Sequence, residues 1–277
     1  MAQTMLEQPG YAMAAAVSSS FATSTRIPPR QLPQPHMGLT GPELLPTTCS
    51  ACHLRRLCLP CGMTGPDVER LDSLMFDRRS IRAGETLYRQ GDAFKFIYAS
   101  RGGMFKSAMA LNDGREQVSG FHMAGEQVGL DGVATGLHGT TATALEDTEV
   151  CAIPYAGLAD KMAGSAGTLN LLGRLMSQQI VREHGLMMLL GSMSADERLA
   201  VFLLNLAGRL KARGYSSCEF HLRMTRAEIG SHLGMKIETV SRTFSAFQKQ
   251  GLLVVNKRHV RILDTQSLSR MFESKMH

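Results

Sequence analysis

The sequence predicts an α+β fold, in which a β-domain of jelly-roll type is followed by one long helix and a small helical domain. Three observations support this prediction. Short segments broken by glycine-containing turns run from about Arg78 to Pro154, and many short strands at such spacing are typical of a β-sandwich or jelly roll. A long helical repeat follows in residues 166–199. Two short helices and a hairpin pattern come after it.

Length and composition indicate a globular protein of more than one domain. The 277 residues allow two ordinary domains and a tail, and the 44% hydrophobic and 19% charged residues are typical of soluble proteins. No run of eighteen apolar residues occurs, and the first residues lack the pattern of a secretory signal. We therefore expect a cytoplasmic protein with no membrane contact. Residues 1–48 hold seven of the ten prolines and predict a disordered tail.

A cysteine-rich segment follows the tail in residues 49–66. The stretch TTCSACHLRRLCLPCGM places four of the six cysteines of the chain at Cys49, Cys52, Cys58 and Cys61. Stable disulfides are rare in the cytoplasm, where clustered cysteines more often hold metal or sense redox state. Both zinc and iron–sulfur clusters use thiolates at short spacing. The residues alone leave these two possibilities open.

Residues 67–166 form the predicted jelly-roll domain. GPDVERLDSLM is typical of a short helix with Asp67 near its start, and the strand segments come after it. MALNDGREQVSGF predicts a hairpin whose turn is Asn112–Gly114.

The long helix is predicted over residues 167–192. One stripe at steps of three and four contains Leu169, Leu172, Met176, Ile180, Met187 and Leu190, with Glu183 among them. Such a helix could pack on its own domain, but we favour dimerisation because the stripe follows a complete β-domain. Two Glu183 carboxylates would then meet across the dimer and oppose its association. We take Ile180, Glu183 and Met187 as the dimer switch.

Residues 193–277 are predicted to bind double-stranded DNA. From Ser194 onward there are fourteen Lys or Arg against seven Asp or Glu, whereas the whole chain has a net charge of +6. The preceding residues are therefore nearly neutral. A basic C-terminal segment on a neutral body favours a nucleic-acid-binding module.

The stretch MTRAEIGSHLGMKIETVSRTFSAFQKQGLL has the pattern of a helix-turn-helix. Thr225 and Glu228 have the spacing of a capping box, Gly234 breaks the first helix, and a second helix follows from about Lys236. A hairpin with a basic turn at residues 256–258 comes next. Helix, turn, helix and basic hairpin together predict a winged helix-turn-helix.

The second helix of this motif is expected to read bases. Glu238, Ser241 and Arg242 project from one face at steps of three and four. Arg can bind guanine through two hydrogen bonds, Glu can accept from cytosine, and Ile237 is placed to touch a thymine methyl group.

Thr225 and Arg226, at the start of the first helix of the motif, are better placed for phosphate contacts. Such contacts position the protein without reading sequence.

The order of β-domain, long helix and winged helix-turn-helix resembles the Crp/Fnr superfamily of bacterial transcription regulators. The match covers roughly residues 49–265 and is similar to the oxygen-sensing branch, the fumarate and nitrate reduction regulators. The matching features are C-x2-C-x5-C at Cys49, Cys52 and Cys58, GFHMAGEQVGLDGVATGLHGTTATALEDTEVCAIP with Cys151, SADERLAVFLLNL, and E-x-x-S-R at Glu238, Ser241 and Arg242.

This resemblance implies a 4Fe–4S cluster, with Cys49, Cys52, Cys58 and Cys151 as its ligands. Cys61 departs from the pattern. It offers an all-local set of four thiols that would suit zinc, or a substitute ligand for the cluster.

The resemblance also implies an oxygen-sensing activator of anaerobic genes. It implies a homodimer when the cluster is present, binding to a palindrome like TTGAT-N4-ATCAA, loss of binding when oxygen converts the cluster, and contact with RNA polymerase. The hairpin tip Asn112–Glu116 is a candidate for that contact.

The residues also bear on three other functions. Cyclic-nucleotide receptors of the same superfamily hold phosphate with an arginine, and residues 136–144 contain none, so we expect no cyclic nucleotide. We expect no enzyme, because no glycine-rich nucleotide motif or catalytic arrangement occurs. The alternative function is a zinc-stabilised regulator that responds to another ligand in the β-domain.

Overall fold

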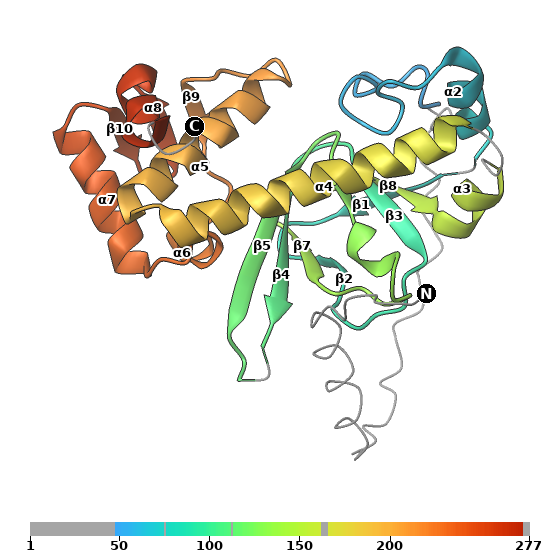
Figure 1. The fold of residues 1–277 in the computed structure, drawn as a ribbon, viewed down its shortest axis with the longest axis horizontal. Helices are drawn as coiled ribbons and strands as arrows, with labels where there is room; N and C mark the ends of the chain where they lie inside the picture. Colours follow the sequence, from blue (N-terminus) through green and yellow to red (C-terminus); the bar gives the residue numbers. More distant parts are fainter. Residues whose placement is uncertain (1–47, 75, 112, 162–165, 274–277) are drawn as a thin grey trace, which may run out of the picture. The chain divides into compact units, whose positions relative to one another are not determined.

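In this computed structural model, residues 48–74, 76–111, 113–161 and 166–273 are described (Figure 1). The predicted tail of residues 1–48 lies almost entirely outside them, as does Asn112 of the predicted hairpin turn. Within the described residues the predicted α+β fold class is confirmed. A β-sandwich is followed by a long helix and a small domain of helices with a three-stranded sheet.

The sandwich consists of two four-stranded antiparallel sheets, with strand orders β1-β8-β3-β6 and β2-β7-β4-β5. Its strands are β1 Asp77–Ile81, β2 Thr86–Tyr88, β3 Phe96–Ser100, β4 Met104–Ala110, β5 Glu116–Met123, β6 Gln127–Val128, β7 Thr141–Ala144 and β8 Thr148–Pro154. Strand β8 lies between β1 and β3. This position makes Arg78 and Ala99 the neighbours of Cys151 on the two flanking strands.

Alternation of apolar and polar residues builds the sandwich. Tyr98, Phe105 and Val150 are buried members of the cluster between the two sheets, as expected for strands with one inward face. The predicted β4–β5 hairpin is present, and Gly114 in its turn has a φ of 84°. A residue with a side chain is strained at such a φ, which explains the glycine.

Three helices flank the sandwich: α2 Gly65–Asp72, α3 Tyr155–Lys161 and α4 Ala166–Ser192. The predicted long helix is therefore present as α4. Its Leu171, Leu175 and Leu189 are buried against the rest of the chain. In contrast, Ile180 and Met187 are 53% and 60% exposed, so α4 has a second apolar stripe that its own chain leaves uncovered.

The C-terminal part contains α5 Ala195–Lys211, β9 Glu219–His221, α6 Arg226–Leu233, α7 Ile237–Lys249, β10 Leu253–Asn256, β11 His259–Ile262 and α8 Thr265–Glu273. The predicted capping box at Thr225 and Glu228 is present, and Gly234 ends α6 with a φ of 61°. Strand β9 and helix α8 were not anticipated. Strand β9 pairs with β11, which widens the predicted hairpin into a three-stranded sheet.

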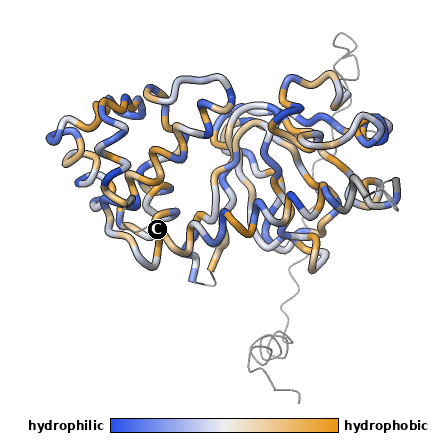
Figure 2. Tube along the Cα trace, turned by 45° about the horizontal axis from the view of Figure 1, so that its top comes forward, coloured by the Kyte–Doolittle hydropathy of each residue, from blue (hydrophilic) through white to orange (hydrophobic). Residues whose placement is uncertain are grey.

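Hydrophobic and hydrophilic residues alternate along the trace (Figure 2). One continuous core joins the C-terminal helices to β4 and β5, with Phe121 of β5 against Phe202 of α5 at a ring-centroid distance of 6.0 Å. None of the described helices is long and apolar enough to cross a membrane.

Candidate metal centre and DNA-reading surface

The cysteine-rich segment is a series of tight turns. The backbone N–H of Cys52 donates to the carbonyl of Cys49, and that of Cys58 donates to the carbonyl of Leu54 at 2.9 Å. Leu59 is 1% exposed and belongs to the same apolar cluster as residues of α4 and β8. Burial of Leu59 holds the segment against the sandwich, while the turns gather the cysteines.

Four cysteines line one cavity. Cys49, Cys52 and Cys58 come from the segment, and Cys151 comes from the centre of β8. Arg101, which follows the end of β3, also lines the cavity. Apolar side chains, including Phe76, Ala99 and Ile153, line the same cavity. The fold therefore places one remote thiol with three local ones. Four thiols in an apolar site are the donor set that a 4Fe–4S cluster uses.

The cavity disfavours thiolate charge in the absence of a compensating cation. Burial, with smaller effects of neighbouring cysteines, raises the pKa of Cys49 far above its usual value, and burial raises the pKa of Cys58 to about 11. Burial also raises the pKa of Cys151, whereas the charge and hydrogen bonding of Arg101 act in the opposite direction. Metal ligation by these thiols would therefore release protons.

Cys61 lies outside this group. It lines an adjacent cavity with Cys49, Arg55 and Arg56. Among the described residues, no three His, Cys, Asp or Glu side chains are placed to hold a single metal ion. Cys218 is exposed near β9, beside Ser216.

The dimer-switch residues lie on α4. Ile180 and Met187 are exposed, and Glu183 is half-buried, where its Oε1 atom accepts a hydrogen bond from Nε2 of Gln179 at 2.5 Å. Leu169 is predicted on the same stripe, but its side chain is not among those that the structure describes. The three switch residues thus occur on one helix, on side chains that their own chain does not fully cover.

The predicted DNA-reading residues are exposed together on α7. Ile237, Glu238, Ser241 and Arg242 are all on the surface, whereas the opposite face of α7 buries Val240, Phe244 and Phe247 in the core. This amphipathic division orients the four predicted contacts toward solvent.

Thr225 and Arg226 have other partners in this structure. The Thr225 hydroxyl caps α6 by accepting from the N–H of Glu228 at 3.1 Å. The guanidinium carbon of Arg226 lies 3.3 Å from the centre of the Phe244 ring, and burial lowers the pKa of Arg226 to about 10. A cation–π contact therefore holds Arg226 inside its domain. Its phosphate contact stays a prediction.

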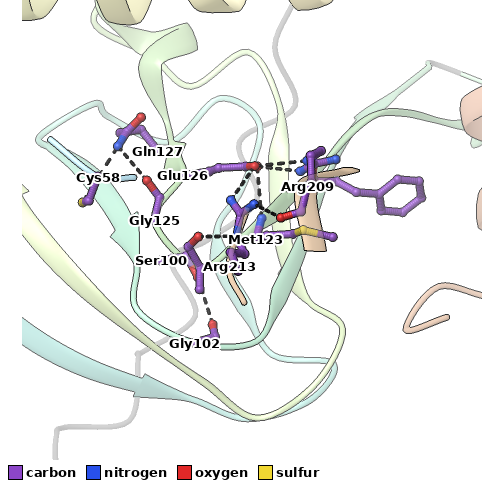
Figure 3. A network of polar contacts seen from close by, with 11 residues as sticks. Cys58, Ser100, Gly102, Met123, Gly125, Glu126, Gln127, Arg209 and Arg213 are labelled. Atoms are coloured by element: carbon purple, nitrogen blue, oxygen red, sulfur yellow. Dashed lines mark hydrogen bonds and ion pairs between the residues drawn. The ribbon is translucent and has the colours of Figure 1, made fainter. Parts of the chain in front are cut away.

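Sequence reasoning missed a buried ion-pair group around Glu126. Its carboxylate binds the guanidinium groups of Arg209 and Arg213, near the end of α5 (Figure 3). Arg209 lies in the last turn of α5 and Arg213 in the turn that follows the helix. No local pattern indicated that their partner would be a turn more than eighty residues away.

Comparisons with known proteins identify the family. The model of the cyclic nucleotide-binding domain matches residues 78–165, and the model of the Crp-like helix-turn-helix domain matches residues 197–271. The transcriptional activator protein anr of Pseudomonas aeruginosa is 41% identical over 86% of this chain and 93% of its own length. This chain belongs to the Crp/Fnr family of transcription regulators.

Other Crp/Fnr proteins agree with this assignment. The transcriptional regulatory protein btr of Bordetella pertussis is 43% identical, over 80% of this chain and 92% of its own. The fumarate and nitrate reduction regulatory protein of Escherichia coli is 38% identical, over 80% of this chain and 89% of its own length. The solved structure of FixK2 from Bradyrhizobium japonicum is similar, with a TM-score of 0.66 and 29% identity. The similarity covers 72% of this chain and 98% of FixK2. The chain is thus a DNA-binding, dimer-forming transcription regulator and not an enzyme.

Proposed function

We propose that this regulator is an oxygen- or redox-responsive activator of anaerobic genes, and that a 4Fe–4S cluster bound by Cys49, Cys52, Cys58 and Cys151 controls its dimerisation. The observation that carries the proposal is the common cavity of these four thiols. When bound, the cluster supplies a redox centre that oxygen attacks. Similarity to the fumarate and nitrate reduction regulatory protein supports the anaerobic role.

The chain's own residues connect this cavity to the dimerisation helix. Nη2 of Arg174, on α4, donates to the carbonyl of Leu59 at 2.9 Å. Leu59 also packs in one cluster with Leu171 and Leu175 of α4. Ligation of Cys58 together with Cys151 would hold Leu59 in this position and so hold α4. Without ligation the segment loses this restraint, and non-covalent contacts such as these hold it.

Dimerisation then depends on a balance along α4. Exposed Ile180 and Met187 gain by burial in a partner helix, whereas two Glu183 carboxylates repel each other. When α4 is held firmly on its own chain, packing on the partner helix is favoured. When α4 is loosened, repulsion between the two Glu183 carboxylates dominates. The dimer places two α7 helices about one DNA turn apart, roughly 34 Å, on a palindrome such as TTGAT-N4-ATCAA.

Activation requires contact with RNA polymerase, and the β4–β5 hairpin tip is the proposed surface. Met109 and Leu111 near this tip are 43% and 49% exposed. Both side chains are available to a partner protein at this tip.

The deciding experiment is an anaerobic determination of iron, sulfide and zinc with an absorption spectrum, repeated in air. We expect about four iron and four sulfide per chain, and a broad visible band that changes in air. One zinc per chain and no visible band would contradict the cluster. That result would support the zinc-stabilised regulator, with Cys61 as the fourth ligand.

A further inference from the structure

The turn between β5 and β6 makes a dense set of contacts with the DNA-binding part of the chain (Figure 3). Glu126 Oε1 accepts hydrogen bonds from Nε of Arg209 at 3.1 Å and from Nη2 of Arg213 at 2.7 Å. Its Oε2 accepts from Nη2 of Arg209 at 2.6 Å. The side chains of Glu126 and Arg213 are only 13% and 7% exposed. Water screens such a pair much less than a surface pair.

The same two arginines also hold the backbone of this turn. Arg209 Nη2 donates to the carbonyl of Phe121 at 2.6 Å, and Arg213 Nε donates to the carbonyl of Ala124 at 2.7 Å. Charged donors on backbone carbonyls and a fork-shaped ion pair restrict both distance and direction. Residues 121–126 therefore determine where the end of α5 lies.

The other side of the turn contacts the cysteine-rich segment. Gln127 Nε2 donates to the carbonyl of Gly125 at 3.1 Å and lies 3.9 Å from the Cys58 sulfur. Gly125 has a φ of 86°, and a Cβ atom there would lie 2.8 Å from Cβ of Leu57. Three consecutive residues, 125–127, thus touch a proposed ligand segment on one side and α5 on the other.

We propose that Glu126 is a positioning residue that orients the winged helix-turn-helix domain on the sandwich, and that residues 125–127 make this orientation depend on the cysteine-rich segment. The dependence on that segment rests on the proposed function. The orientation in this structure leaves the reading face of α7 exposed. Regulation then acts inside each chain as well as through dimerisation.

The test of positioning compares Glu126→Gln with Glu85→Gln in the full chain. Glu85 is the matched control, because its carboxylate accepts a local backbone hydrogen bond, from Arg82 N at 3.0 Å, and pairs with no arginine among the described residues. The dimer dissociation constant is measured by analytical ultracentrifugation, and DNA affinity is measured by fluorescence anisotropy with the dimer saturated. We expect Glu126→Gln to weaken DNA binding about tenfold with an unchanged dimer constant.

Equal DNA affinity in the two variants, or a weakening fully explained by loss of dimer, overturns the role of Glu126. If Glu126→Gln does not fold, Glu126→Asp is used, because its shorter side chain keeps the charge but cannot reach both arginines. Both variants are made in a Glu183→Ala background, where dimers are expected without the cluster, so these measurements need no iron. Their outcome is therefore independent of whether the cluster proposal holds.

The test of coupling uses Gln127→Leu in a Glu183→Ala background, where dimers are expected with and without the cluster. We expect the cluster-loaded Glu183→Ala dimer to bind DNA more tightly than the cluster-free one. Gln127→Leu should reduce this ratio at unchanged iron content. The coupling is overturned if the cluster-loaded and cluster-free Glu183→Ala dimers bind DNA with equal affinity. It is also overturned if Gln127→Leu leaves the ratio of these two affinities unchanged. Absence of iron from every sample contradicts the proposed function and the coupling together, but not the positioning by Glu126.

Discussion

Arg242 and Arg226 belong to the same DNA-binding domain but have different surroundings. Arg242 is exposed on α7, where its Nη2 atom lies 3.4 Å from the Thr239 hydroxyl. Arg226 is stacked on Phe244. At the scale of the residue, a guanidinium on an exposed helix face can enter the major groove, whereas a stacked one must first give up its aromatic contact.

Replacing Arg242 by Ala is expected to remove discrimination at one base pair of the half-site, by roughly 1–3 kcal/mol. The physical reason is the loss of a two-donor contact with guanine. Affinities for operators with single base changes measure the effect, and Lys249→Ala at the C-terminal end of α7 is the control. Uniform weakening on all operators would instead assign Arg242 to phosphate.

Arg101 is expected to slow the reaction of the proposed cluster with air. Its guanidinium lies in the four-cysteine cavity and forms an ion pair with Glu149 at 3.1 Å. A nearby positive charge makes loss of an electron from an anionic centre harder. Arg101→Gln should therefore lose its visible absorption faster in air than Arg56→Gln, whose Arg56 lines the neighbouring cavity. Identical decay rates would remove Arg101 from this role.

At the scale of the element, α4 carries two apolar faces with different tasks. Leu171 and Leu175 attach it to the sandwich and the cysteine-rich segment, while Ile180 and Met187 remain exposed. A change in how one face of such a helix packs on its own chain can alter how the other face packs on a partner helix. Glu183 lies on the exposed side, and repulsion between its two copies opposes packing on the partner helix.

Glu183→Ala is expected to be a dimer in air. Removing two like charges about 4 Å apart strengthens association by roughly 1–4 kcal/mol at effective dielectric constants of 80 to 20. Analytical ultracentrifugation of the aerobic protein measures this change, and His184→Ala, exposed on the same helix, is the control. A monomeric Glu183→Ala protein in air would rule out charge repulsion as the switch.

At the scale of the whole molecule, a continuous core and the partly buried His232 join the sandwich to the C-terminal helices, and a second partly buried histidine, His122, lies within the sandwich on β5. His122 Nε2 lies 2.9 Å from the Ser107 hydroxyl, and His232 Nδ1 lies 3.3 Å from the Val118 carbonyl. Burial lowers the pKa of each histidine to about 4. For His122, the charges of Arg209 and Arg182 act in the same direction, and those of Glu126 and Asp131 oppose it.

Acid is therefore expected to destabilise the fold between pH 6.5 and 4. The unfolded chain binds protons on both histidines in this range and the folded chain does not, so stability is complete above pH 6.5 and falls as the pH is lowered. From pH 7 to 5 the loss is about 2 kcal/mol for each histidine. The pKa of Glu126 is lowered to about 2, burial being outweighed by the two arginines, so Glu126 stays ionised throughout.

Urea unfolding of the cluster-free protein at pH 7 and pH 5 measures this loss. His232→Gln should remove about half of it, whereas His221→Gln, exposed on β9, should leave it unchanged. Equal stability of the unmodified chain at the two pH values would contradict the assignment.

Local signals in the sequence were sufficient for several features. The capping box at Thr225, the break at Gly234 and the face containing Glu238 and Arg242 depend on spacings within one or two helical turns. The β4–β5 hairpin likewise depends on its own turn residues. Such features follow from neighbours in the chain, so sequence reasoning alone determined them, together with the fold class and the α4 stripe.

Only the tertiary structure decided which distant groups meet. Pairing of β8 with β1 and β3 places Cys151 in the cavity of Cys49, Cys52 and Cys58, and leaves Cys61 in the next one. The Glu126 contacts with Arg209 and Arg213, and the stacking of Arg226 on Phe244, were equally absent from any local pattern. Spacing along a chain constrains residues on one element, whereas contacts between elements depend on how whole faces pack.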